Sequence, residues 1–376
     1  MKFRCERDDL LEAVQFASRA ISNRATLPVL SGLKVHASDG GSVAVAATDL
    51  ELTMGTAFRA SVDEPGITIV PGRLLGEMSR SLAAGQVLVA SGNGELEIDS
   101  GRGRFRMKTL SQEDYPALPI EDEGQGATSI EVSGGVLATA LSQVTKSASA
   151  DESRQVLTGV LWELMDGSLN LAATDSYRLA VKELEVSGGP AEMRKVILPA
   201  RALNELARAL QGSVARVRAE VKEHLIVFAL LSEGEGDGGG TVIGTRFIEG
   251  EFPKYRQLIP EGYANTLSVQ REPLLEVVKR VGLLAQNNMP VKLRLGAELE
   301  VSAHTPDVGE GQEVLDATYE GEPLVIAFNP QFMVDGGTAI RGDQLVLQAG
   351  DGLKPAILRG EDSDRFTYLL MPVRLS

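Results

Sequence analysis

The pattern of hydrophobic positions predicts the same helix twice in this chain. Two stretches share the skeleton Pro-x-Arg-x-Leu-x-Glu-x-x-Arg-x-Leu and begin at Pro71 and Pro199. On a helix, the two arginines of each stretch lie almost above one another. The apolar positions fall on the opposite face; they are Leu75, Met78 and Leu82 in the first stretch and Leu203, Leu206 and Leu210 in the second. Each stretch is therefore predicted to pack on one side and to present two guanidinium groups on the other.

Further anchors place this helix inside a longer internal repeat. Val-Leu-Ser-Gly at 29–32 is matched by Val-Leu-Thr-Gly at 156–159, and Ala-Ala-Thr-Asp at 46–49 recurs at 172–175. The anchors keep their order and a nearly constant spacing, which indicates a true repeat. A fainter third copy begins near Leu267.

The repeat predicts three domains, which cover residues 1–122, 128–255 and 263–376. In each copy a short strand leads into an amphipathic helix, such as 2–5 followed by 8–20 in the first copy. Alternating strands, the proline-led helix and further strands follow at hairpin-length spacing. This order predicts an α+β fold with mostly antiparallel sheets, in three tandem copies of one domain.

Composition and charge narrow the class of protein to which the chain can belong. The 376 residues are 43% hydrophobic, which is enough for well-packed cores. A net charge of −15 argues against an overall positive coat for nucleic-acid binding, but it leaves a local basic surface possible. Cys5 is the only cysteine, and no apolar run approaches the roughly 18 residues of a membrane span. We therefore expect a cytoplasmic protein without a membrane partner.

The sequence carries no catalytic signature. The three histidines lack metal-ligand spacing, and Walker, Rossmann and Gly-x-Ser-x-Gly motifs are missing, so we expect no metal, no cofactor and no enzymatic activity. Asp49 and Asp175 could be imagined as catalytic carboxylates. Their recurrence at a strand end in two copies favours a turn of the Asx type.

The arginine stripes also have an ordinary explanation. Arg73 and Glu77, like Arg201 and Glu205, are i,i+4 pairs, so the stripes could be solvated faces with weak ion pairs. Two equivalent helices in a repeat array favour a common role, because such an array points equivalent faces at one surface.

Four local stretches, together with the repeat, carry a family resemblance. They are Arg-Ala-Thr-Leu-Pro-Val-Leu at 24–30, Ala-Thr-Asp-Ser-Tyr-Arg-Leu-Ala-Val at 173–181, Glu-Phe-Pro-Lys-Tyr at 251–255 and Met-Pro-Val-Arg-Leu at 371–375. The whole chain resembles the bacterial sliding clamp, the β subunit of the replicative DNA polymerase. The resemblance implies a head-to-tail homodimer that forms a six-domain ring around duplex DNA and tethers the polymerase. A clamp-like paralogue that binds peptides without encircling DNA is the alternative.

The resemblance implies a channel lined by the second helix of each copy. Its arginines would neutralise phosphates without reading bases; the residues are Arg24, Arg73, Arg80, Arg201 and Arg208. The third copy lacks the arginine pair after Asn329-Pro330, so its inner face should be less cationic. Residues 154–156 (Arg-Gln-Val) replace the aromatic residues with which relatives often touch DNA, so a DNA contact there is left open.

The resemblance also implies an apolar cleft between copies two and three. It would bind a short hydrophobic peptide carried by polymerases, the clamp loader and repair proteins. Its lining would be Leu157, Thr174, Ser176, Tyr177, Arg178, Leu179, Pro253, Leu258, Asn329, Phe332, Leu353, Pro355, Leu369, Met371, Pro372, Val373 and Arg374. Ser176-Tyr177 and Phe332 depart from the usual family residues, which leaves the peptide preference open. Without the motif match, each apolar member would be read as core.

A dimer interface is the last implication. It would join Met78, Leu82, Arg104 and Phe105 of copy one to Leu283 and Leu284 of copy three in the partner. Pairing the strand that carries Phe105 across subunits would cover an exposed sheet edge.

Overall fold

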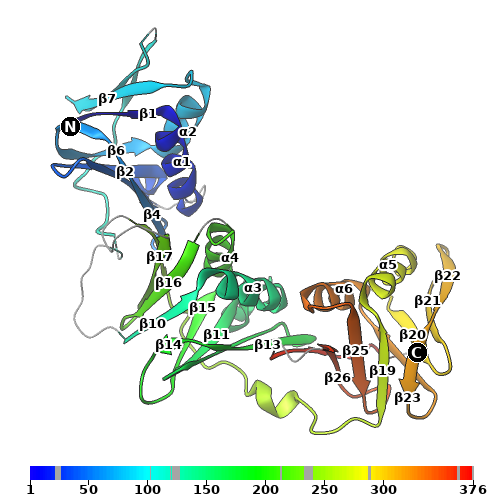
Figure 1. The fold of residues 1–376 in the computed structure, drawn as a ribbon. Coiled ribbons are helices and arrows are strands. Elements are labelled where there is room, and N and C mark those ends of the chain that lie inside the picture. Colours follow the sequence, from blue (N-terminus) through cyan, green and yellow to red (C-terminus); the bar gives the residue numbers. More distant parts are fainter. Residues whose placement is uncertain are drawn as a thin grey trace. The chain divides into compact units, whose positions relative to one another are not determined.

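A computed structural model describes residues 1–21, 27–101, 103–118, 120, 128–211, 214–232, 240–286, 289–361 and 365–374. These residues form two compact units (Figure 1). Unit one comprises Met1–Leu137 and Arg208–Phe247, and unit two comprises Ala138–Ala207 and Ile248–Ser376. The units differ from the three predicted copies because strands of neighbouring copies pair within one sheet.

Unit one contains two antiparallel sheets. The first has the order β5-β1-β7-β8-β9, and the second runs β10-β16-β17-β18-β4-β3-β2-β6. Helices α1 and α2 pack against one another, and α1 also lies on β3 and β4. The bounds are β1 Lys2–Glu6, α1 Arg7–Ala17, β2 Gly32–Ser38, β3 Ser42–Thr48, β4 Leu52–Arg59, β5 Ser61–Glu64, β6 Gly66–Pro71, α2 Gly72–Ser81, β7 Gln86–Gly92, β8 Glu95–Asp99, β9 Arg104–Lys108, β10 Thr128–Ser133, β16 Val214–Val221, β17 Leu225–Ser232 and β18 Thr241–Arg246.

Unit two also contains two antiparallel sheets. Their orders are β15-β11-β12-β13-β27-β26-β25-β19-β23 and β22-β21-β20-β24, and α5 packs on α6. The bounds are β11 Gly159–Met165, β12 Ser168–Thr174, β13 Arg178–Glu185, β14 Ser187–Gly188, β15 Arg194–Pro199, β19 Asn265–Gln270, α5 Arg271–Gly282, β20 Val291–Leu295, β21 Leu299–Thr305, β22 Gly309–Leu315, β23 Ala317–Glu320, β24 Leu324–Phe328, α6 Pro330–Ala339, β25 Gln344–Ala349, β26 Ala356–Gly360 and β27 Phe366–Leu370. Two further helices, α3 (Gly134–Val144) and α4 (Ala200–Ala209), include residues of both units.

The elements confirm the predicted α+β repeat. The first strands of the copies are β1, β10 and β19, and the helix expected at 8–20 is α1 followed by the 3-10 turn Ser18–Ala20. Pro71 stands at the N-cap of α2, and Pro330 begins α6. No helix in the described ranges has the length and apolar character needed to cross a membrane.

The two-faced character of the repeated helix is also confirmed. Leu75, Leu203 and Leu206 are at most 1% exposed, whereas all four arginines of the skeleton are exposed. Leu82 and Leu210 are buried as well, and Met78 is half-buried. Each helix is therefore packed through its leucine face and carries its arginines on the exposed face.

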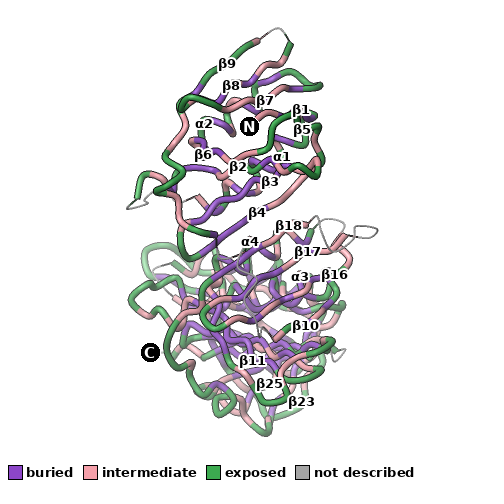
Figure 2. Tube along the Cα trace, turned by 90° about the vertical axis from the view of Figure 1, so that its left-hand side faces the viewer, coloured by how far each residue is buried: buried purple, intermediate pink, exposed green. Residues whose placement is uncertain are grey.

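Each sheet ends in two edge strands. Among these edge strands are β9 in unit one and β22 in unit two. Four of the five residues of β9 are exposed, and Figure 2 draws most of this strand in green. An exposed edge presents unpaired backbone groups that another chain can complete.

Candidate functional site

The turn between β12 and β13 is built by Thr174 and Asp175. Asp175 Oδ1 accepts hydrogen bonds from the backbone N–H groups of Tyr177 (2.9 Å) and Arg178 (3.0 Å). Thr174 Oγ1 accepts one from the N–H of Ser176 (3.2 Å), which has a φ of 81°. The side chains satisfy backbone groups that the left-handed residue leaves without ladder partners.

The first copy contains the same turn. Asp49 Oδ1 accepts from the N–H groups of Glu51 (3.1 Å) and Leu52 (2.8 Å), and Leu50 has a φ of 80°. The Asx-type turn predicted in both copies is therefore confirmed. It supplies the structural role that the sequence favoured over catalysis.

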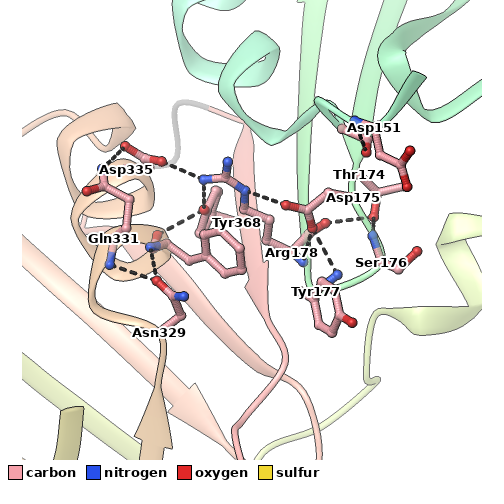
Figure 3. Close-up of polar contacts among 12 residues, drawn as sticks. Asp151, Thr174, Asp175, Ser176, Tyr177, Arg178, Asn329, Gln331, Asp335 and Tyr368 are labelled. Carbon is pink, nitrogen blue, oxygen red and sulfur yellow. Dashed lines mark hydrogen bonds and ion pairs between the residues drawn. The ribbon is translucent and has the colours of Figure 1, made fainter. Parts of the chain in front are cut away.

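Arg178 connects this turn to α6 in unit two. Its Nε lies 3.0 Å from Asp175 Oδ2, and its Nη1 lies 2.6 Å from Asp335 Oδ2 and 3.4 Å from the Tyr368 hydroxyl. The guanidinium carbon stands 4.4 Å from the centre of the Phe332 ring. Figure 3 shows the guanidinium group between the two carboxylates. Burial disfavours the charged form, but these partners outweigh it, and the pKa of Arg178 is raised.

The α6 side of this network is equally connected. Asn329 Oδ1 caps the helix by accepting from the N–H groups of Gln331 (2.9 Å) and Phe332 (3.2 Å). Gln331 Nε2 donates to Asp335 Oδ1 (3.0 Å), and the Tyr368 hydroxyl donates to the Phe332 carbonyl (2.9 Å). Sequence reasoning missed Asp335 and Tyr368. The available signal was Arg178 itself, because an arginine in a buried strand needs a carboxylate partner.

Exposed or half-buried apolar side chains stand at the ends of three neighbouring strands. Tyr177, Met371 and Pro355 each lie one residue outside the paired parts of β13, β27 and β26. The Met371 N–H donates to the Tyr177 carbonyl (2.9 Å). Tyr177 is 62% exposed and Leu353, two residues before Pro355, is 68% exposed. With Leu258 (48%) and Met371 (37%), these residues are called the apolar surface.

A buried cluster in the same strands supports this surface. Leu179 and Leu369 pair across β13 and β27 and are 1% and 2% exposed. Tyr255 belongs to the cluster and begins the 3-10 helix η6 (Tyr255–Leu258). The first residue of η6, Tyr255, is therefore buried in the cluster, whereas its last residue, Leu258, is exposed.

The predicted cleft residues divide by exposure. Buried members are Thr174, Arg178, Leu179 and Leu369; half-buried members are Leu157, Asn329, Phe332, Pro355, Pro372 and Val373; exposed members are Ser176, Tyr177, Pro253, Leu258, Leu353, Met371 and Arg374. Only the exposed and half-buried groups offer surface for direct contact. The buried ones shape the surface from within unit two.

The predicted cationic residues are on helix surfaces where they are described. Arg73 Nε is 3.0 Å from Glu77 Oε1, and the two side chains are 91% and 59% exposed. The ion pair of the ordinary explanation is thus present, and such exposed pairs are worth less than about 1 kcal/mol, so a phosphate can displace it. Arg24 lies outside the described residues. Arg154 contacts the Asx turn, because its Nη1 donates to the Asp175 carbonyl (3.2 Å).

Three of the predicted interface residues, Arg104, Phe105 and Leu284, lie on or against the edge strands β9 and β22. Phe105 on β9 is 36% exposed, and Arg104 beside it is exposed. Leu283, just beyond α5, is 73% exposed. A Cβ placed on Gly311 of β22 would stand 2.8 Å from Leu284 Cδ1, so Leu284 lies against that strand. Leu82, at 6% exposure, and half-buried Met78 offer little surface.

The described residues contain no group of three or more His, Cys, Asp or Glu side chains that could hold a metal ion.

Comparison with known proteins shows that one family matches nearly the whole length of the chain. Models of the DNA polymerase III beta subunit match in three parts: the N-terminal domain at 1–119, the central domain at 131–254 and the C-terminal domain at 256–374. The beta sliding clamp of Streptomyces coelicolor is 36% identical over 390 residues, and that of Synechocystis is 33% identical over 400 residues, each alignment covering 100% of both chains.

Solved structures agree with the sequence comparison. A DNA polymerase sliding clamp from Bacillus subtilis matches with a TM-score of 0.92 at 26% identity, and a sliding clamp from Bartonella birtlesii bound to griselimycin matches with a TM-score of 0.92 at 30% identity. Both comparisons cover 100% of each chain.

Proposed function

The chain belongs to the DNA polymerase III beta-subunit family, the beta sliding clamps, and we propose that two copies close head-to-tail into a ring around duplex DNA. It is a DNA sliding clamp without catalytic activity of its own. The ring would tether the replicative polymerase in the cytoplasm, so that processivity follows from topology. A peptide-binding scaffold that does not encircle DNA is not favoured, because the family match spans the whole chain.

The main support for the ring proposal is that β9 and β22 are edge strands whose counterparts in the repeat are paired. In unit one β18 pairs with β4, and in unit two β27 pairs with β13. In the repeat, β9 is the counterpart of β18 and β27, and β22 is the counterpart of β4 and β13. Pairing β9 of one copy with β22 of another would therefore repeat a strand order that the chain already uses twice.

The observed registers specify how these edges would meet. Counted across the paired strands, Phe105 is the counterpart of Ile243 and Tyr368, which pair with Met54 and Ala180. Ile243 is 0% exposed and Tyr368 is 1% exposed, because a neighbouring copy covers each. Phe105, at 36%, has no such cover among the described residues.

The same count places Gly311 as the counterpart of Met54 and Ala180. Phe105 of one subunit would thus lie opposite Gly311 of the partner subunit, where Leu284 packs against the strand in place of a side chain. The strands also carry opposite charges: Arg104, Arg106 and Lys108 on β9, and Glu310 and Glu313 on β22.

A disulfide between the two edges tests both the ring and its register. The register pairs Arg104 with Gln312, so an Arg104→Cys, Gln312→Cys variant should form a covalent dimer on mild oxidation. Cys5 will not compete, because burial raises the pKa of its thiol to about 12. An Arg104→Cys, Val314→Cys variant displaces one cysteine by two residues and should remain monomeric on a denaturing gel. Equal cross-linking of both variants, or of neither, would reject this pairing.

The arginine helices supply the DNA-facing part of the proposal. Arg24, Arg73, Arg80, Arg201 and Arg208 would contact phosphates of duplex DNA independently of its sequence. The equivalent, exposed placement of the four described arginines on α2 and α4 supports this role. A few loose phosphate contacts suit a protein that must slide.

The apolar surface supplies the partner-binding part. We infer that it holds a short hydrophobic peptide of the replicative polymerase, the clamp loader or a repair protein. Exposed Tyr177, Leu258, Leu353 and Met371 provide adaptable apolar contacts. Arg178 ties the turn that carries Tyr177 to Tyr368 of β27, the strand that ends just before Met371.

Met371→Asp tests this surface. It should abolish binding of a synthetic peptide copied from the clamp-binding segment of a bacterial polymerase, because the bound peptide would bury the new carboxylate against apolar side chains. The solution mass should stay that of the dimer. Unchanged peptide binding would reject Met371 as a contact.

A further inference from the structure

A buried carboxylate ties the segment that carries Leu258 to the sheet of unit two. Glu163 lies in β11, and its side chain is 1% exposed. Its Oε1 is 2.9 Å from Lys195 Nζ of the adjacent strand β15, and it accepts from Arg256 Nη1 at 3.2 Å. Its Oε2 accepts from the Tyr255 hydroxyl at 2.9 Å. Two of its three partners therefore belong to η6.

The Tyr255 ring is held on its other sides. It is 3% exposed and belongs to the buried cluster with Leu179 and Leu369. Phe252 meets it edge-on, with ring centres 6.4 Å apart, and the Arg256 guanidinium lies 5.1 Å from its centre. Because Tyr255 is both bonded to Glu163 and part of η6, its ring links the position of the η6 backbone to that of Glu163.

The backbone of η6 is bonded locally. The Tyr255 N–H donates to the Pro253 carbonyl (2.7 Å), and the Gln257 N–H donates to the Lys254 carbonyl (3.2 Å). These bonds shape the turn without fastening it to a strand. Its attachment to the sheet consequently depends on side chains, of which the Glu163 group is charged and buried.

We propose that Glu163 is a positioning residue for the partner-binding surface, acting through Tyr255 and Arg256 to fix η6 so that Leu258 is presented to an apolar peptide. Glu163 does not touch the ligand, because it is buried in β11. The inference rests on the proposed function of the apolar surface. Burial alone would raise the pKa of the Glu163 carboxyl, but bonds from Lys195, Arg256 and Tyr255 lower it overall. The anchor is therefore charged at neutral pH.

Glu163→Gln tests this role, because the amide keeps the size of the side chain and loses its charge. We expect binding of the synthetic polymerase peptide to weaken about tenfold. Leu258→Ala should weaken it to a similar degree. In the double variant the two losses should not add, because Glu163 acts only through the placement of Leu258.

A matched control uses Glu131 of unit one, which accepts from Arg216 (3.3 Å) and Arg218 (3.0 Å). Glu131→Gln removes the charge from a 31%-exposed carboxylate that is paired with two arginines, and it should leave peptide binding unchanged. Hydrogen exchange of the 255–259 amides should accelerate in Glu163→Gln and stay the same in Glu131→Gln. Faster exchange at 255–259 with unchanged exchange at the other amides of unit two would separate release of η6 from general destabilisation of that unit.

The outcomes separate this inference from the proposed function. If the wild-type protein fails to bind the peptide, the function of the surface is wrong. If it binds and Glu163→Gln binds equally well, or if the losses with Leu258→Ala add in full, the positioning role is wrong. Should Glu163→Gln fail to fold, Tyr255→Phe removes only the hydroxyl contact and must show the same non-additive loss.

Discussion

The charged side chain of Arg178 is buried, with only 10% of it exposed. Asp175, three residues away, is a local partner, but Asp335 is 157 residues distant in sequence and Tyr368 is 190 residues distant. The motif therefore identified Arg178 and its turn, whereas the α6 partners depend on tertiary packing that a local pattern does not encode. The expected ligand contact of Arg178 becomes, in this geometry, a bridge between two elements.

Arg178→Ala should destabilise unit two strongly. The substitution leaves the carboxylates of Asp175 and Asp335 buried without their cation, and breaking a buried ion pair from one side costs about 3–5 kcal/mol. Urea denaturation followed by tryptophan fluorescence reports it, because Trp162 lies buried in the same unit. Arg73→Ala removes an exposed pair and should leave the unfolding midpoint unchanged. Equal midpoints for the two variants would contradict the bridging role.

We expect the contribution of Glu163 to the free energy of unfolding to be lost in acid. Its pKa is lowered in the folded chain, while the unfolded value is about 4.3. A depressed carboxyl pKa stabilises fully above the unfolded value, and the contribution is lost as the pH falls through the folded value. The difference in unfolding free energy between wild type and Glu163→Gln should be constant from pH 7 to about 5 and shrink below the unfolded pKa. A difference that grows in acid would refute this assignment.

At the scale of elements, hydrophobic periodicity predicted β1, α1 and the proline-led helices α2 and α4. The pairing of β18 with β4, and of β27 with β13, was beyond its reach, because alternation fixes which face of a strand is buried and leaves its neighbour unspecified. Periodicity could not predict η6 either, because only four residues of the segment are helical. Its attachment to the sheet comes from Glu163, which lies 92 residues before Tyr255 in the sequence.

Opposite charges on β9 and β22 predict a rescue experiment. The proposed register places Arg106 opposite Glu310 of the partner subunit, and opposite charges across a strand pair stabilise it modestly. Arg106→Glu should raise the dimer dissociation constant about tenfold through like-charge repulsion, and adding Glu310→Arg should restore it. Sedimentation equilibrium measures each variant. Failure of the second change to restore the dimer would reject the pairing, as would an equal rescue by Glu313→Arg.

At the scale of the whole molecule, the main feature is a contrast in charge. The chain carries a net charge of −15, yet its two repeated helices each expose a pair of arginines. Neutralised phosphates release counterions, so Arg73→Ala with Arg201→Ala should weaken DNA binding and reduce the log–log salt slope by about 0.9 for each phosphate that is no longer neutralised. Fluorescence anisotropy with duplex DNA at several salt concentrations gives both quantities. Arg294→Ala removes an exposed arginine of β20 and should change neither. An unchanged slope in the double variant would leave the stripes as solvated faces.

The most direct test asks whether the protein is held on DNA by topology. The Arg104→Cys, Gln312→Cys variant would be loaded on nicked circular DNA by a bacterial clamp loader, oxidised, and passed through a sizing column in high salt. The ring account predicts that the protein stays with the circles and is released once a restriction enzyme linearises them. Equal loss from circular and linear DNA would contradict it.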